Sequence, residues 1–134
     1  MSGNPNKRVV TAANGPKPNP MMSNVIVSGD KVYLAGILGT DESGGLVAGG
    51  AKAETAQALQ NVSARLELAG LDLSDVISVT IYLTDYAVNL PLLNEVYLPT
   101  FSQHGPAPVR AAVGVAALPF NAAAEFSVIA ATRA

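Results

Sequence analysis

The chain contains no cysteine, no tryptophan and one histidine among its 134 residues. Without thiols it has no disulfide, no iron–sulfur cluster, no cysteine zinc site and no cysteine nucleophile. A single imidazole also excludes most other zinc, copper and iron sites, which usually use two or more histidines. His104 stands in a loop-like Gln-His-Gly-Pro sequence and no nucleophile-elbow motif is present. The sequence therefore predicts neither a metal centre nor a Ser-His-Asp triad.

Charge is also scarce. Charged residues make up 13% of the chain and the formal net charge is −2, whereas a typical domain is about one-quarter charged. The eight basic residues are scattered and aromatic residues make up only 5%. Nucleic-acid binding calls for a clustered basic surface and stacking aromatics, so the sequence speaks against it. A surface this poor in charge favours an oligomer that covers part of it.

Long hydrophobic runs are missing, although 49% of the residues are hydrophobic. The most apolar tract, Ala111 to Ala124, is broken by Pro119 and Asn121 and is shorter than the roughly 18–20 residues of a spanning helix. The first eight residues contain no apolar segment of the signal-peptide type. We therefore expect a cytoplasmic protein. The length suits one domain over residues 1–134, with 1–20 largely loop.

The first half of the chain predicts a hairpin followed by a helix. Two β-branched runs between Val25 and Ile37 flank a Gly29-Asp30 turn, which is typical of a β-hairpin. From Lys52 to Ala69 apolar residues recur at spacings of three and four, which predicts an amphipathic helix ending at Gly70.

The second half predicts a strand and a second helix. Residues 76–84 alternate, which places four apolar side chains on one face of a half-buried strand: Ile77, Val79, Ile81 and Leu83. Asn89 is the expected N-cap of the next helix, with Pro91 in its first turn. Pro99 is expected to kink or shorten that helix, because proline removes an internal hydrogen bond.

Two further strands are predicted at 109–116 and 124–131, and residues 9–11 could add a short one. The order β-β-α-β-α-β-β predicts an α/β (α+β) fold with one mixed sheet and both helices on one face. The other face carries apolar and small residues, either Val113 with Val115 or Ala112 with Gly114. No third helix covers that face, so we expect it to pack against other subunits.

The last third of the chain holds two formal charges between Val96 and Thr132, and both interrupt apolar strands: Arg110 and Glu125. A buried guanidinium needs an anion, because an unpaired charge costs several kcal/mol. One interpretation pairs Arg110 with Glu125 across neighbouring strands. In the other, Arg110 binds a substrate carboxylate through its planar fork while Glu125 orients a water. The pattern leaves both open.

The remaining polar candidates carry weaker signals. His104 is expected to be an exposed loop residue or to lie at an interface. Asn94, one helical turn before Tyr97, is expected to bind either a loop carbonyl or a ligand. Asp72 and Asp75 indicate a solvated turn before a strand. The glycines at 36, 39, 44 and 45 do not form a phosphate loop, because no Gly-Lys-Ser/Thr follows them.

Several segments together give a specific resemblance. They are Val32-Tyr33-Leu34-Ala35-Gly36, the helix from Gln57 to Gly70, Val79 to Asp85, Asn94 to Tyr97, Pro108 to Val113, Val115 to Pro119, and Glu125. From about Val9 to Ala131 the chain resembles the RidA (YjgF) family of imine deaminases. The resemblance implies a chorismate-mutase-like fold and a homotrimer with a central barrel and ligand clefts between subunits. It also implies hydrolysis of 2-iminoalkanoates, such as 2-iminopropanoate and 2-iminobutanoate, to 2-keto acids and ammonia without a cofactor.

The resemblance assigns roles to five positions. The family arginine that binds the substrate carboxylate falls on Arg110, and the acidic residue that positions the water falls on Glu125. The cleft glycine falls on Gly36 and the helix asparagine on Asn94. The backbone of Ala112 is a further contact that the resemblance implies.

Other positions depart from the family pattern. The cleft aromatic falls on Met22, and the polar residues beside the glycine fall on Ala35 and Ile37. The serine after the arginine is Ala111. The resemblance therefore implies a more apolar and roomier cleft. It leaves open a deaminase of a larger enamine, such as an aminomuconate, and a non-catalytic trimer that binds a small ligand. Ribonuclease activity, described for some members, is disfavoured by the dispersed cations.

Overall fold

A computed structural model describes residues 3–11 and 19–133. It contains a six-stranded mixed sheet in the order β1-β2-β3-β6-β4-β5. The strands are β1 (Arg8–Val9), β2 (Val25–Ser28), β3 (Lys31–Leu34), β4 (Val76–Leu83), β5 (Val109–Gly114) and β6 (Ala124–Ala131). Strands β4 and β5 run parallel, and the other neighbours are antiparallel.

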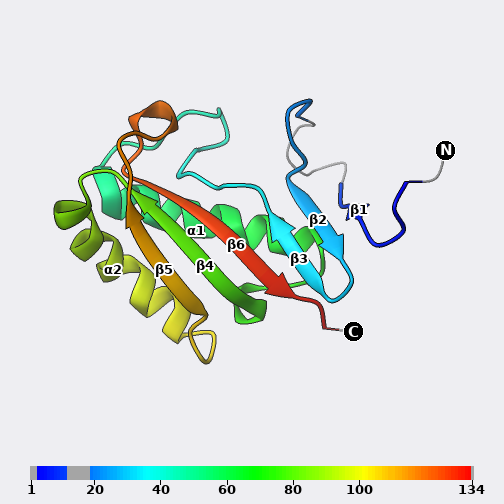
Figure 1. The fold of residues 1–134 in the computed structure, drawn as a ribbon. Coiled ribbons are helices and arrows are strands. Elements are labelled where there is room, and N and C mark those ends of the chain that lie inside the picture. The colour runs from blue at the N-terminus through cyan, green and yellow to red at the C-terminus, as the bar shows by residue number, and fades with distance from the viewer. Residues whose placement is uncertain (1–2, 12–18, 134) are drawn as a thin grey trace.

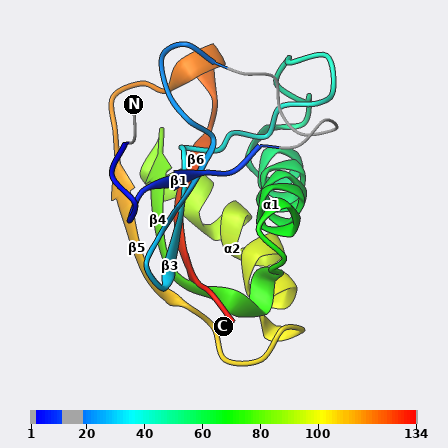
Figure 2. The same ribbon diagram turned by 90° about the vertical axis from the view of Figure 1, so that its right-hand side faces the viewer.

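Two helices, α1 (Gly50–Leu68) and α2 (Tyr86–Ser102), cover the same face of the sheet, as Figures 1 and 2 show from two directions. Two short 3-10 turns, Leu73–Asp75 and Pro119–Asn121, precede β4 and β6. The predicted fold class and element order are confirmed. The predicted loop 1–20 contains β1, and its residues 12–18 lie outside the described part of the chain.

The hairpin and the first helix follow the local sequence signals. Ser28 pairs with Lys31 across the predicted turn, and Gly29 adopts a φ of 58° that is readily accessible to glycine. Helix α1 ends within two residues of the predicted end, and Gly70 follows with a φ of 75°.

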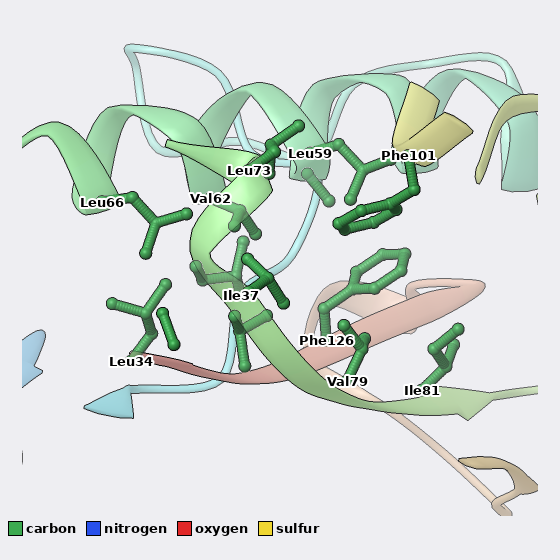
Figure 3. Packing of buried hydrophobic residues seen from close by; sticks show 14 of the residues in the cluster. Leu34, Ile37, Leu59, Val62, Leu66, Leu73, Val79, Ile81, Phe101 and Phe126 are labelled. Atoms are coloured by element: carbon green, nitrogen blue, oxygen red, sulfur yellow. The ribbon is translucent and has the colours of Figure 1, made fainter. Parts of the chain in front are cut away.

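The core lies between the helices and the sheet. Figure 3 shows Leu59, Val62 and Leu66 of α1 pointing toward side chains of the sheet, among them Ile37 and Phe126. All five are at most 3% exposed. Fully burying an aliphatic or phenylalanine side chain contributes about 1.5–3 kcal/mol, so this row fixes α1 against β6 and the segment after β3.

Helix α2 departs from the prediction at its start. It begins at Tyr86, with Asp85 preceding it, so the expectation that Asn89 is the N-cap is wrong. Asn89 lies inside the first turn and its Nδ2 donates to the carbonyl of Thr84 at 2.6 Å. Pro99, which was expected to kink or shorten the helix, does not shorten it, because the helix continues to Ser102. Pro99 lies on the exposed side of the helix, away from the packed core.

One side chain of β4 is on the opposite face from the one predicted. Val79, Ile81 and Leu83 are buried, but Ile77 is 38% exposed. A β-bulge between Val76 and Ser78 inserts an extra residue and reverses the alternation at that point.

The face of the sheet away from the helices is open and carries exposed apolar side chains. Val109 and Val113 of β5 and Tyr33 of β3 are 71%, 41% and 44% exposed. Ala112 instead packs against the core, so Val113 belongs to the open face. Within residues 3–11 and 19–133, no helix covers this face. None of the helices described has the length and apolarity needed to cross a membrane.

Candidate functional site

Arg110 lies on β5, the edge strand of the sheet. It stands opposite Val79 of β4, and because Val79 faces the helices, Arg110 also points toward α2. Its Nη1 donates to Asn94 Oδ1 at 2.7 Å, which is the one hydrogen bond to the guanidinium among the described residues. A guanidinium carries five N–H donors in a planar fork, so Arg110 keeps donors for a carboxylate.

Tyr97 supports the same guanidinium and was not predicted as a site residue. The Arg110 Cζ lies 4.9 Å from the centroid of the Tyr97 ring, within the range of a cation–π contact. Tyr97 is 2% exposed, and its hydroxyl has no hydrogen-bond partner in the described part of the chain. Burial raises the pKa of Tyr97 to about 12, and the Arg110 charge opposes that shift. The phenol therefore stays neutral under Arg110.

Asn94 and Tyr97 stand one turn apart on α2, a spacing that places both on one side of the helix. Together they hold Arg110 from two directions. Asn94 thus has a different partner from the loop carbonyl considered in the sequence. The spacing was visible in the sequence, but the pairing of α2 with β5 was not.

Glu125 lies on β6, opposite Tyr82 of β4. Its neighbours Ala124 and Phe126 are fully buried toward the helices, so Glu125 points to the open face. Partial burial raises the pKa of Glu125. No hydrogen bond or ion pair to this carboxylate occurs within residues 3–11 and 19–133. An unpaired carboxylate with a raised pKa is suited to accept a proton.

Gly36 lies directly beside Glu125. A Cβ placed on Gly36 would overlap the Oε2 of Glu125 and come within 3.2 Å of its Cδ. Any larger residue at position 36 therefore displaces the carboxylate. Gly36 and Glu125 are brought together, as expected if both belong to one site.

Of the two interpretations left open by the sequence, the one that pairs Arg110 with Glu125 is wrong. Strand β4 lies between β5 and β6, and the two side chains point to opposite faces of the sheet. The interpretation assumed that β5 and β6 are neighbours in the sheet because they are consecutive in the chain. The parallel crossover through α2 places β5 at the edge, while β6 enters between β3 and β4.

Ile37 does not contribute to the surface around Glu125. It is 2% exposed and points into the core (Figure 3), so the expectation that it makes the cleft more apolar is wrong. Alternation explains this, because Gly36 already occupies the open face. Ala111 is exposed and Ala35 is half-buried. Met22 is 52% exposed and forms an isolated bridge with Asn19.

The remaining predictions concern turns. His104 is half-buried after α2 and its backbone N–H donates to Phe101. Asp72 and Asp75 form a capping box and both pair with Arg133, at 3.2 Å and 2.7 Å. The turn is thus held by ion pairs as well as solvated. No group of three or more His, Asp or Glu side chains suited to a metal ion occurs in the described ranges.

Comparisons with known proteins agree with the fold and show the family. The family model described as Endoribonuclease L-PSP matches residues 12–132. A RutC family protein of Pyrococcus horikoshii is 40% identical over 125 residues, covering 92% of this chain and 97% of the relative. A Homo sapiens protein named 2-iminobutanoate/2-iminopropanoate deaminase is 35% identical over 125 residues, covering 92% and 89%. The crystal structure of RidA from Psychrobacter sp. PAMC 21119 is 35% identical with a TM-score of 0.82, covering 92% of this chain and 98% of that one.

The chain belongs to this family, the RidA (YjgF) proteins that its sequence resembles. Its relatives include proteins named as deaminases of reactive imines.

Proposed function

We propose that the protein hydrolyses 2-iminoalkanoates, such as 2-iminobutanoate and 2-iminopropanoate, to 2-keto acids and ammonia. The observation that carries this is Arg110, held by Asn94 and Tyr97 with donors left for a carboxylate. The name of the Homo sapiens relative supports the substrate class. The proposal treats the chain as one cytoplasmic domain that needs no cofactor.

The proposed site is built by two subunits. Arg110 and Glu125 point to opposite faces of one chain's sheet, so a substrate that touches both takes them from different chains. We propose a homotrimer whose clefts lie between subunits. The exposed Val109, Val113 and Tyr33 on the open face support an assembly that covers them, since burying apolar surface is favourable.

In the proposed reaction Arg110 binds the substrate carboxylate and thereby orients C2. Protonation of the imine nitrogen makes C2 electrophilic. Glu125 accepts a proton from the attacking water, and its raised pKa makes it a stronger base than an ordinary carboxylate. The carbinolamine nitrogen then takes this proton back from Glu125, the C–N bond breaks to release ammonia, and the hydroxyl loses its proton, which leaves the 2-keto acid. Gly36, Asn94, Ala112 and Met22 are the proposed substrate-binding neighbours.

The test is keto-acid release from 2-iminobutanoate generated by threonine dehydratase, with semicarbazide competing for the imine. The wild-type protein should release keto acid faster than the enzyme-free mixture, and Arg110→Ala should not. Arg8→Ala is the matched control, because Arg8 is exposed on β1, and it should keep full activity. A folded wild-type protein that gives no acceleration contradicts the proposal.

Two alternative functions would use the same site. Ala35 and Ala111 stand where the family pattern has polar side chains, which favours a larger enamine such as an aminomuconate. A non-catalytic trimer would bind 2-ketobutyrate through Arg110 without turnover. A substrate panel distinguishes the first alternative, and a binding titration with 2-ketobutyrate distinguishes the second.

A further inference from the structure

Helix α1 carries a buried carboxylate that the proposed reaction does not use. Glu54 is 4% exposed, and its Oε1 accepts a 2.8 Å hydrogen bond from the backbone N–H of Ala123. Burying a carboxylate is costly, and partial compensation comes from the donors it meets. A methionine would fill a similar volume without that cost, so the carboxylate calls for an explanation beyond packing.

The partner of Glu54 lies at the start of the strand that carries Glu125. Ala123 is two residues before Glu125, where the chain enters β6. Thr84, the residue after β4, holds the same segment: its N–H donates to the carbonyl of Ala123 at 3.1 Å, and its Oγ1 donates to the carbonyl of Ala122 at 2.9 Å. Glu54 supplies the acceptor that this segment otherwise lacks.

The segment on the other side of Glu125 also meets α1 at Glu54. A Cβ on Gly39 would lie 2.7 Å from the Cα of Glu54, so the chain after β3 passes against the helix backbone there. Ile37 and Phe126 exchange two backbone hydrogen bonds of 2.8 Å each. The stretch that carries Gly36 is thus joined to β6 and packed on α1 at one point.

Asn61 extends this arrangement along the helix. It stands seven residues after Glu54, which places both on one face of α1. Its Nδ2 donates to the carbonyls of Leu38 and Thr40 at 3.0 and 2.9 Å. One polar row of α1 therefore holds the two segments that bring Gly36 and Glu125 side by side.

We propose that Glu54 is a positioning residue for Glu125: through Ala123 it fixes the start of β6 and so sets where the Glu125 carboxylate stands beside Gly36. This rests on the proposed function, because it takes Glu125 as the group that activates the water. Glu54 itself touches neither the water nor the substrate.

Three substitutions test this role. Glu54→Met keeps the approximate volume and removes the acceptor. Glu54→Gln keeps a carbonyl oxygen that can accept from Ala123, and Glu54→Asp keeps the carboxylate on a chain one methylene shorter. Glu67→Gln is the matched control, because Glu67 is exposed on the same helix. All four are compared with wild type for kcat and KM on 2-iminobutanoate.

Misplacing a reacting group lowers the rate of the chemical step, so Glu54→Met should lose about tenfold in kcat with KM within twofold. Glu54→Gln and Glu67→Gln should keep kcat within about twofold, and Glu54→Asp should fall between them. Equal kcat in Glu54→Met and wild type overturns the proposal. An equal loss in Glu54→Gln and Glu54→Met also overturns it, because the hydrogen-bond acceptor is then not what matters. If Glu54→Met does not fold, Glu54→Asp takes its place. A lowered kcat in Glu54→Asp then supports the proposal, and a kcat equal to that of wild type overturns it.

A readout without turnover separates this proposal from the proposed function. The carboxyl carbon of Glu125 is followed by NMR as a function of pH in the same variants. The titration midpoint of Glu125 should fall toward the ordinary value in Glu54→Met, because a loosened carboxylate gains water, and stay unchanged in Glu54→Gln. An unchanged midpoint in Glu54→Met overturns the positioning role. A wild-type protein that folds but does not deaminate refutes the proposed function and leaves this midpoint to decide on Glu54.

Discussion

Arg110 and Tyr97 form a stacked pair in which the guanidinium carbon lies 4.9 Å from the ring centroid. The ring is fixed in the core, with Phe101 4.6 Å away, while the guanidinium stays accessible at the sheet edge. The rigid Tyr97 ring thus orients the flexible Arg110 side chain. Because Arg110 is already ordered, binding a carboxylate would cost less side-chain conformational entropy.

The first prediction separates the ring of Tyr97 from its hydroxyl. Tyr97→Phe should keep KM and stability, because the hydroxyl has no partner among the described residues and removing an unsatisfied group costs little. Tyr97→Leu should raise KM about twofold to fivefold, the size of an exposed cation–π contact. Steady-state kinetics with 2-iminobutanoate measures both. Equal KM values in the two variants would show that the contact of the Tyr97 ring with Arg110 does not contribute to substrate binding.

The second prediction concerns Asn94. Asn94→Ala removes the 2.7 Å bond to Arg110 and should raise KM a few-fold. Asn94→Asp should raise it further, because the new carboxylate pairs with Arg110 and competes with the substrate. Inhibition by 2-ketobutyrate should weaken in the same order. Tighter 2-ketobutyrate binding in Asn94→Asp than in Asn94→Ala contradicts this role.

The third prediction uses the contact between Gly36 and Glu125. Gly36→Ala should lower kcat about tenfold or more, because the new Cβ displaces the carboxylate. Gly45→Ala is the control, since a Cβ there meets only Ser43 Oγ, at 3.8 Å. Kinetics and thermal unfolding are measured together. Full activity in a folded Gly36→Ala protein would mean that the position of Glu125 is not critical.

The fourth prediction follows from the raised pKa of Glu125. Its folded pKa exceeds its unfolded pKa, so the folded state binds more protons between the two values and stability falls as pH rises through that window. Glu125→Gln removes this loss. The variant should therefore melt higher than wild type at pH 8, with the difference vanishing below about pH 4, where both states of the wild-type carboxyl are protonated. A lower melting temperature for Glu125→Gln at pH 8 would indicate that the ionised carboxylate is stabilised in the fold.

Local patterns predicted the elements whose boundaries depend on neighbouring residues. The Gly29-Asp30 turn, the apolar face of α1 and the strand at 124–131 were all predicted correctly, because each reflects contacts close in sequence. The exposed position of Ile77 was not predicted, because a β-bulge reverses the alternation of the strand and leaves no signal in the sequence. The start of α2 was placed too late because Asn89 binds Thr84 from within the first turn.

The site was harder to predict because it depends on strand order. Arg110 and Glu125 could be singled out as charges in apolar strands, but their faces follow from the insertion of β6 between β3 and β4. In the sequence, Tyr97 resembles an ordinary core residue and Glu54 an ordinary helix residue. Only the packing of α2 on β5 and of α1 on Ala123 gives them a second role.

The most direct test of the shared site mixes two inactive variants. Arg110→Ala and Glu125→Gln subunits are co-expressed with different tags, and the mixed trimers are purified and assayed for 2-iminobutanoate hydrolysis. In a cyclic trimer with one site at each subunit contact, each mixed trimer restores one of its three sites, about one-third of the wild-type number, when Arg110 and Glu125 come from different chains. Activity near that level supports a site between subunits. Mixed trimers as inactive as either parent would contradict it.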